Sequence, residues 1–509
     1  MKKTKIIFYI ITITLITILS SCAKVNEKSI EDIATGNAKM KVSVHDPQVI
    51  VAEDGSYYMF GTHMTAAKAN SLTDWSMFAT GVGARNKLFD NLFDEEKEAF
   101  AYVGKNEDGR YSVWAPDVIY NKATGKYMMY FCTTSTYVKS NLCFATADSV
   151  EGPYTYQNTI LYSGFTSSTV KKTNFYDIMP EDTKITAYVK NGSYNNLEWP
   201  NCIDPALFYD KNGKLWMVYG SWSGGIFLLQ IDEETGYPIH PEANPDSGVD
   251  TYFGKKLAGG GHNSIEGPYI QYDEDTRYYY LIVSYGVLTS DGGYQIRQFR
   301  SKTVDGTYLD AKGQTLDTVV DHSDYGVKMM GNYTLPSLDC TYMAPGGQST
   351  FTDSEGKMYL VYHQRFKDGT ESHEPRIHQL FSTSDGWLVA TPFASNGESL
   401  KENGYQSKDV TGTYYILNHG TDISSNENLG KETTFSSGAI KGEYEGSYQV
   451  KKGSSDISIT IDGVIYKGIL IDMTDEAGNP VRCFSAVGDN NQTIWGVHYL
   501  ENAEDESIN

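Results

Sequence analysis

The sequence is poor in three features that mark common protein classes: positive charge, paired cysteines and helical periodicity. Its formal net charge is −22, so it has no cationic surplus to neutralise a polyphosphate backbone, which argues against nucleic acid as a partner. Its six cysteines form no CxxC motif and no Cys/His spacing typical of zinc. Apolar residues hardly recur at helical spacing across residues 45–395, which favours a β-rich structure there.

Aromatic residues, in contrast, are abundant. They make up 13% of the chain, with 39 tyrosines, and such richness suits β-sheets and surfaces that stack flat ligands. A chain of 509 residues is too long to fold around one ordinary hydrophobic core. We therefore expect two domains, or one large β-architecture with an appendage.

The N-terminus has the pattern of an export signal. Lys2, Lys3 and Lys5 precede a short apolar stretch that ends in Leu-Ser-Ser-Cys at Cys22, and the stretch is too short and wrongly flanked for a membrane span. The last four residues resemble a bacterial lipobox, whose cysteine is lipid-modified. This predicts a signal peptide at 1–21, lipidation of Cys22 and a polar tether at 22–43. The alternative is an ordinary secretory signal.

With a lipid on Cys22, the protein is predicted to sit on a bacterial envelope, at the outer membrane and facing outward, with the anchor as its one membrane contact. The other five cysteines are an odd number. We expect mostly buried free thiols, with Cys132 and Cys143 as a possible disulfide pair.

One hairpin pattern recurs five times between residues 44 and 395. A Gly or Thr followed by a basic residue or Ser opens an aromatic-aliphatic strand, and a matching strand precedes it; the hairpins start at Gly55, Gly125, Gly213, Thr276 and Gly356. Such recurrence predicts an all-β fold, a five-bladed β-propeller over residues 44–395. A β-sandwich is the alternative, but it does not predict fivefold recurrence.

Three of the leading strands carry an acid at a similar distance from the hairpin. Asp46 and Asp204 lie nine residues before their Gly, and Glu266 lies ten before Thr276, so we expect the three at one structural place, converging on the central channel. Asp117 lies eight residues before Gly125. A one-residue shift turns a strand side chain to the other face, which favours a structural role for Asp117.

Converging carboxylates repel one another, so their presence suggests a function. They suit either an oxygen cage for calcium or the acid and base of a glycosidase. Asp46 and Asp204 stand in Asp-Pro corners, whereas Glu266 follows a Gly-rich stretch, and different surroundings separate a proton donor from an acceptor. Catalysis is favoured, with Glu266 as general acid, Asp46 as general base and Asp204 as the group that orients and tunes.

The segments "HDPQVI", "IDPALFYDKNGKLWMVYG" and "IEGPYI" together resemble glycoside hydrolase family 43. The resemblance implies a five-bladed propeller with an Asp, Asp, Glu triad at Asp46, Asp204 and Glu266. It also implies inversion of the anomeric centre, with a water between base and sugar and carboxyl groups roughly 6.5–9.5 Å apart.

Within that family, "YHQRF" and "HEPRIHQLFSTSDGWLVATPF" resemble two-domain endo-arabinanases. This implies cleavage of α-1,5-linked L-arabinan from plant cell walls, or of arabino-oligosaccharides, by a monomer. It also implies one metal ion, usually calcium (Ca2+), held in the channel by a histidine and waters, and the matching position is His363. The alternative for His363 is a core histidine, since calcium prefers oxygen ligands.

Substrate contacts are expected where aromatic and polar side chains flank the acids. The residues are His45, Trp75, Trp114, Trp222 and Asn263, since apolar rings stack on sugars. An exo-acting arabinofuranosidase or xylosidase would use the same triad. A surface lipoprotein that binds glycan without cleaving it is the alternative from another class.

Beyond a polar linker after Phe393, residues 405–509 alternate in strand fashion. They predict a small antiparallel β-barrel or sandwich without an obvious catalytic group.

Overall fold

The computed structural model describes residues 27–94, 99–317 and 320–501. The predicted signal peptide and Cys22 lie outside the described residues. Among the helices of these ranges, none has the length and apolar character that a membrane crossing requires.

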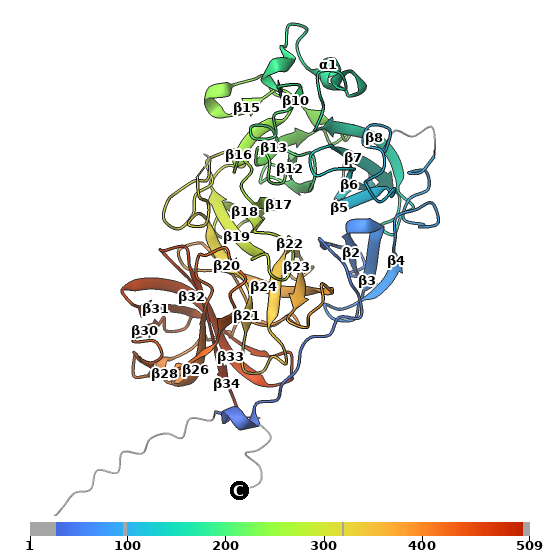
Figure 1. Cartoon of the computed structure of the whole chain (residues 1–509). Coiled ribbons are helices and arrows are strands. Elements are labelled where there is room, and N and C mark those ends of the chain that lie inside the picture. The colour runs from blue at the N-terminus through green and yellow to red at the C-terminus, as the bar shows by residue number, and fades with distance from the viewer. Residues whose placement is uncertain (1–26, 95–98, 318–319, 502–509) are drawn as a thin grey trace, which may run out of the picture.

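Five antiparallel sheets follow one another along the chain and form the predicted five-bladed propeller (Figure 1). Blade one consists of β1 Gln48–Val51, β2 Tyr57–Gly61, β3 Thr65–Ala69 and β4 Ser76–Ala79. Blade two consists of β5 Ser112–Asn121, β6 Lys126–Thr134, β7 Ser140–Ala147 and β8 Thr155–Tyr162. Blade three consists of β11 Ala206–Tyr209, β12 Leu215–Tyr219, β13 Ile226–Ile231 and β16 Gly254–Ala258, with β14 Pro238–Ile239 and β15 Val249–Asp250 beside them.

Blade four consists of β17 Ile265–Asp273, β18 Tyr278–Tyr285, β19 Gln295–Ser301 and β20 Val327–Met330. Blade five consists of β22 Tyr342–Thr352, β23 Met358–Phe366, β24 His373–Ser382 and β25 Leu388–Ala390, extended by β21 Tyr333–Thr334. A separate hairpin pairs β9 Val189–Lys190 with β10 Ser193–Tyr194. The helices are short: α1 Phe175–Ile178, η1 Ile30–Asp32, η2 Thr62–Met64, η3 Val170–Lys172, η4 Ile185–Ala187, η5 Pro245–Ser247 and η6 Ser407–Val410.

The first strand of each blade lies nearest the axis, and these five strands contact one another in a closed ring, β1-β5-β11-β17-β22. Each is approached through one residue with left-handed φ: Asp46, Ala115, Asp204, Gly267 and Gly347. In four blades a proline follows that residue. Two residues after it, the ladder with the second strand begins in blades one and three and resumes after an irregularity in blades two, four and five. This corner is the common reference point of the blades.

Comparison of the corners shows that the three acids do not all occupy the same structural place, contrary to the prediction. Asp46 and Asp204 occupy the left-handed position, but in blade four Gly267 does, so Glu266 lies one residue earlier. Its backbone therefore corresponds to that of His45 in blade one. The count from the turn already contained this offset: Gly267 lies nine residues before Thr276, as Asp46 lies nine before Gly55, whereas Glu266 lies ten before Thr276. The prediction was wrong because it treated ten residues as equivalent to nine.

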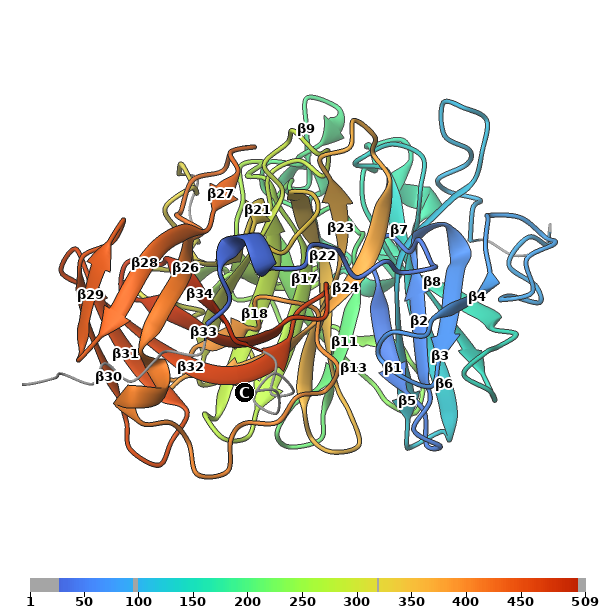
Figure 2. The ribbon, with the colours of Figure 1, turned by 90° about the horizontal axis from the view of Figure 1, so that it is seen from below.

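The C-terminal region is a closed eight-stranded barrel, so the barrel alternative was right and the sandwich was not. Its strands are β26 Gly412–Asn418, β28 Lys431–Ser436, β29 Ala439–Gly442, β30 Gly446–Val450, β31 Asp456–Ile461, β32 Val464–Thr474, β33 Pro480–Gly488 and β34 Thr493–Tyr499. The barrel packs beside blades four and five (Figures 1 and 2). Strand β27, Asn428–Leu429, pairs in parallel with β21, and one apolar cluster spans both domains, including Tyr333, Leu360 and Trp495.

Most of the predicted tether at 22–43 is not a spacer. From Glu27 onward it lies across the barrel and then the propeller as a strap, residues 27–44 (Figure 2). Lys28 N donates to Tyr499 O at 3.1 Å and Gly36 N to Ser337 O at 2.9 Å, and Ile33 is 8% exposed. The polar composition of this segment suggested that it is exposed to solvent. Instead, the strap binds both domains through its backbone.

The possible disulfide between Cys132 and Cys143 is absent; both are buried free thiols. In the register of β6 and β7, Cys132 faces Leu142 and Cys143 faces Phe131. Paired residues share a face and adjacent residues do not, so the two thiols point to opposite faces of the sheet. Cys202 and Cys483 are buried free thiols as well, and Cys340 is half-buried.

Candidate active site

The inner strands of all five blades line one cavity of about 920 Å³. Asp46, Trp114, Asp204, Glu266 and Gly347 each contribute to its wall, one from each blade. The volume lies in the range of small-molecule sites, roughly 300–1,000 Å³. The three predicted acids therefore meet in one pocket although they are far apart in sequence.

Asp46 is surrounded by donors. Thr62 Oγ1 donates to Asp46 Oδ2 at 2.6 Å and itself accepts from Ala115 N at 2.9 Å, while His45 Nδ1 lies 2.9 Å from the same Oδ2. Burial alone would raise the pKa of Asp46, but the charge and hydrogen bond of His45, with His363 and Thr62, lower it well below its usual range. Asp46 is therefore a carboxylate throughout the physiological pH range.

Glu266 has a different environment. Tyr294 Oη donates to Glu266 Oε1 at 2.8 Å and Ser221 Oγ to Oε2 at 3.0 Å. Burial nevertheless raises the pKa of Glu266, with a further contribution from the charge of Asp46, and these effects outweigh the two hydrogen bonds. The side chain is thus disposed to keep a proton that Asp46 has lost.

Asp204 resembles Glu266 rather than Asp46, because its pKa is raised. Burial and the negative charges of Glu266 and Asp46 raise the pKa of Asp204, although Gly267 N donates to its Oδ2 at 3.2 Å. Because Asp204 and Glu266 disfavour each other's ionisation, the pair favours retention of a proton. This arrangement suits a group that tunes the acid.

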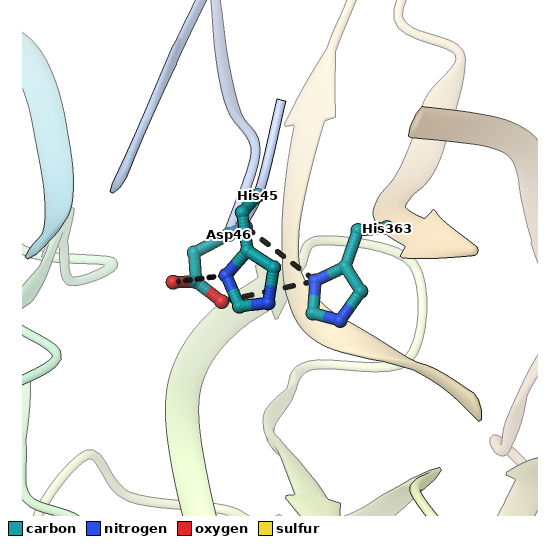
Figure 3. Close-up of side chains that lie close together, drawn as sticks. All are labelled: His45, Asp46 and His363. Atoms are coloured by element: carbon teal, nitrogen blue, oxygen red, sulfur yellow. Dashed lines mark hydrogen bonds and ion pairs between the residues drawn. The ribbon is translucent and has the colours of Figure 1, made fainter. Parts of the chain in front are cut away.

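Three side chains cluster where β1 meets β23. His45, Asp46 and His363 bring their ligand atoms within 4.8 Å of one another, and the two imidazole rings stack with centroids 4.0 Å apart (Figure 3). His363 is fully buried, and its Nε2 has no hydrogen-bond partner in the described chain. Burial and the neighbouring His45 lower the pKa of His363 well below its usual value, so the ring is neutral.

The predicted substrate residues divide into two groups. His45, Trp114 and Trp222 line the cavity. Trp75 does not reach it: the ring is 2% exposed, packs near Tyr57 and donates to Leu72 O at 2.8 Å. Asn263 also points elsewhere, since its Nδ2 donates to Val320 O at 3.0 Å.

Sequence reasoning missed the hydroxyl groups that hold the acids: Thr62, Ser221 and Tyr294. Thr62 and Ser221 each follow a Gly at the end of a hairpin's second strand, in "FGT" and "YGS", which is the one local signal. His373, edge-on to His45 at 5.0 Å, was missed too.

Asp117 supports a neighbouring blade. Its Oδ2 accepts from Leu207 N of blade three at 2.5 Å, as the structural interpretation implies. Its Oδ1 is buried and unpartnered within the described residues, and burial raises the pKa of Asp117 to about 8.

A propeller whose axial cavity holds one carboxyl group with a lowered pKa and another with a raised pKa has the equipment of a glycoside hydrolase. Comparison with known families agrees: the profile described as "Glycosyl hydrolases family 43" matches residues 160–388, and "C-terminal lipocalin-like domain" of the same family matches 392–496. The chain is 39% identical over 479 residues to extracellular endo-α-(1→5)-L-arabinanase 2 of Bacillus subtilis, covering 90% of this chain and 93% of the relative. It is 36% identical to the extracellular endo-α-(1→5)-L-arabinanase of Thermotoga petrophila over 90% and 94% of the two chains.

Solved structures give the same result. A family 43 glycoside hydrolase from Bacillus licheniformis superposes with a TM-score of 0.78 at 37% identity, over 90% of this chain and 98% of the other. The Thermotoga petrophila endo-1,5-α-L-arabinanase gives 0.77 at 34% identity, over 90% and 99%. The chain belongs to glycoside hydrolase family 43, and it is a glycoside hydrolase.

Proposed function

We propose that this enzyme cleaves α-1,5-linked L-arabinan internally, with inversion. The observation that carries the proposal is the pair of carboxyl groups with opposite environments in one cavity, Asp46 among donors and Glu266 buried with a raised pKa. The substrate is proposed from the two relatives named endo-arabinanases that cover most of this chain.

In the proposed reaction Glu266 protonates the glycosidic oxygen as the bond to the anomeric carbon breaks. Asp46 takes a proton from the water that attacks the opposite face of the sugar, and Asp204 keeps Glu266 protonated and oriented. Trp114 and Trp222 on the cavity wall offer apolar rings to the furanose faces. General acid and base groups each contribute typically 10²–10⁴-fold.

The product profile on linear arabinan tests the activity. Internal cleavage yields mixed oligomers early in the reaction, whereas release of arabinose alone would mean exo attack and reject the endo assignment. Glu266→Gln should remain folded and bind arabinan while losing at least about 10²-fold in kcat. Binding without turnover by the wild-type protein would instead support the glycan-binding alternative.

Stereochemistry tests the mechanism separately. If a water stands between Asp46 and the sugar, proton NMR of the first product from an α-linked arabinan shows the β anomer before mutarotation. A nucleophilic carboxylate would need its partner roughly 5–5.5 Å away and would give the α anomer, which would reject the roles assigned to Asp46 and Glu266.

A divalent cation, calcium by the family resemblance, is proposed at His363. The buried Nε2 of His363 has no hydrogen-bond partner in the described chain and belongs to a neutral ring, so it suits the one protein ligand of a cation. The oxygen ligands that calcium prefers would then come from water. When bound, the cation supplies positive charge to the channel. A calcium titration followed by calorimetry should show one site that His363→Ala removes, and chelation should lower the melting temperature. No heat of binding and no effect of chelator would leave His363 as a packing residue.

Location is proposed from the N-terminal sequence. Lipidation of Cys22 would hold the enzyme at the bacterial outer membrane, facing outward; the two relatives named above are described as extracellular. Cys22→Ser should release the protein in soluble form, and protease treatment of intact cells should degrade the wild-type protein. Membrane association that survives Cys22→Ser would contradict the lipid anchor.

A further inference from the structure

The barrel contacts the segment of the propeller that carries a ligand of the proposed general acid. Residues 286–294, here called the cleft loop, connect β18 to β19, and Val287, Leu288, Thr289 and Tyr294 line the cavity. Residues 419–427 of the barrel, here called the barrel loop, connect β26 to β27. The two loops meet at Gly293: a Cβ added there would lie 2.9–3.0 Å from backbone atoms of Ser424. Backbone therefore packs on backbone.

Gln295 links the two loops by hydrogen bonds. Its Nε2 donates to Gly293 O at 3.1 Å and to Asp422 O at 2.9 Å, and the residue is 1% exposed. Its Oε1 accepts from Arg297 Nε at 3.1 Å and from Nη2 at 3.0 Å. Arg297 Nη2 also donates to Thr421 O.

Lys328 fixes the barrel loop from the blade-four side. Its Nζ donates to Asp422 O at 2.8 Å and lies 3.6 Å from Asp422 Oδ1. Three propeller side chains, Gln295, Arg297 and Lys328, thus bind main-chain carbonyl groups of one barrel segment. Movement of the barrel loop would break the bond from Gln295 Nε2 to Asp422 O, and the same Nε2 binds Gly293 O.

Tyr294 is the next residue and transmits this placement to the acid. It is 2% exposed and its Oη donates to Glu266 Oε1 at 2.8 Å. We propose that the C-terminal barrel positions Tyr294 against Glu266 through the backbone of residues 421–424, with Gln295 as the positioning residue. This gives the barrel a part in the reaction, and it rests on the proposed role of Glu266.

The main test compares two buried glutamines of β19. Gln295→Met removes the link between the two loops. Gln298→Met is the control, because it removes two equally buried hydrogen bonds between blades four and five. In these bonds Gln298 Nε2 donates to Leu388 O at 2.7 Å and Leu388 N donates to Gln298 Oε1 at 3.3 Å. Both variants should lose stability. Only Gln295→Met should lower kcat on arabinan, roughly tenfold, with KM little changed, because misplacing a catalytic hydrogen bond affects the transition state. Combining Gln295→Met with Tyr294→Phe should add no further loss.

A second pair of variants uses glycine. Gly293 and Gly313 have φ of 70° and 74°, but a Cβ meets Ser424 at the first and nothing within 4 Å at the second. Gly293→Ala should therefore reproduce the kcat effect and Gly313→Ala should not. Equal kcat values for Gln295→Met and Gln298→Met, or wild-type kcat for Gly293→Ala, would overturn the proposal.

Hydrogen exchange separates this inference from the proposed function, because it needs no substrate. Amides of residues 286–294 should exchange faster in Gln295→Met than in the wild-type protein or Gln298→Met. If the wild-type enzyme does not cleave arabinan but this difference is seen, the proposed function fails and the positioning contact stands. Unchanged exchange in Gln295→Met would reject the contact.

Discussion

At the scale of single residues, the immediate neighbours of the two carboxyl groups decide how they differ. Asp46 and Glu266 each accept two close polar contacts. The contacts of Asp46 include the imidazole of His45, whereas both donors to Glu266 are neutral hydroxyls. The imidazole of His45 overcomes the effect of burial and lowers the pKa of Asp46, whereas burial raises the pKa of Glu266 despite its hydroxyl donors. This difference shifts the pKa values of the two acids in opposite directions.

Tyr294→Phe should move the basic limb of the pH-activity profile to higher pH. The Tyr294 hydroxyl lowers the pKa of Glu266 by favouring its ionised form, so removing it raises that pKa further and Glu266 stays protonated to higher pH. A hydrogen bond to a charged group is worth roughly 1.5–3 kcal/mol, or one to two pKa units at most. The measurement is kcat/KM against pH.

The matched control for that variant is Tyr285→Phe. Tyr285 is buried and its hydroxyl has no hydrogen-bond partner in the described ranges, so the substitution removes an oxygen without a bond. Its basic limb should coincide with that of the wild-type enzyme. A limb that stays fixed in Tyr294→Phe would mean that the tyrosine does not influence the proton on Glu266.

Asp117→Asn should stabilise the protein increasingly as pH rises. Burial raises the pKa of Asp117 to about 8. Below about pH 4 the carboxyl is protonated in folded and unfolded chains alike, and its contribution to stability is fully present. Between about pH 4 and 8 the unfolded chain releases the proton and the folded chain keeps it, so stability is lost progressively, by an amount of the order of a few kcal/mol.

An asparagine there can still accept from Leu207 N and does not titrate. The difference in unfolding free energy between variant and wild type should therefore grow from pH 4 to pH 8 in urea titrations. Other titrating groups cancel in this difference. A pH-independent difference would show that Asp117 has an ordinary pKa.

At the scale of elements, the corner before each inner strand determines what faces the cavity. Blade five has Gly347 at the left-handed position that Asp46 and Asp204 occupy in blades one and three. A Cβ at Gly347 would lie 2.3 Å from Asp46 Oδ1 and 2.8 Å from His363 Nδ1. No side chain fits at this corner without displacing the base.

Gly347→Ala should therefore fold but lose activity by at least 10²-fold in kcat, because it displaces Asp46 from its donors. Gly356→Ala, at the hairpin turn of the same blade, has φ of 82° and nothing within 4 Å of the added Cβ. It carries comparable backbone strain and should keep wild-type kcat. Similar activities for the two variants would show that strain rather than displacement of Asp46 matters.

The five hairpins and the identities of the three acids could be predicted from the sequence, because Asp-Pro corners and aromatic strands are local patterns. The one-residue offset of Glu266 was also present in the sequence, since Gly267 lies nine residues before Thr276, as Asp46 and Asp204 lie before their glycines. It was missed because Glu266, at ten residues, was taken as equivalent. The hydroxyl donors, in contrast, could not be predicted from the sequence; they are Thr62, Ser221 and Tyr294. They lie 16, 45 and 28 residues from the acids they bind, and the propeller alone brings them together.

At the scale of the whole molecule, two segments outside the blades join the domains. The barrel loop was not predicted because its contacts are made by backbone carbonyls, which leave no residue signature. The strap, residues 27–44, was taken as tether for a similar reason. Glu476 of the barrel illustrates the connection: its Oε2 accepts from Ala38 N of the strap at 2.6 Å and from Tyr342 Oη of blade five, and its Oε1 accepts from Ala394 N at 3.3 Å.

Two isoleucines of the strap can test whether it binds both domains in solution or is a free tether. Ile33 is 8% exposed and belongs to the apolar cluster shared by propeller and barrel, whereas Ile30, three residues earlier, is 59% exposed. If the strap binds in solution as in the structure, Ile33→Ala loses buried contacts of both domains at once. The cost for such a truncation is about 2–4 kcal/mol, and for Ile30→Ala it is within roughly 0.5 kcal/mol.

Thermal unfolding of the two variants beside the wild-type protein measures this. Ile33→Ala should lower the melting temperature by several degrees and broaden or split the transition, because the cluster it weakens holds the barrel to the propeller. Ile30→Ala should unfold as the wild-type protein does. A free tether would give wild-type melting in both variants, since neither side chain would have contacts to lose, and the described arrangement of residues 27–44 would then not exist in solution.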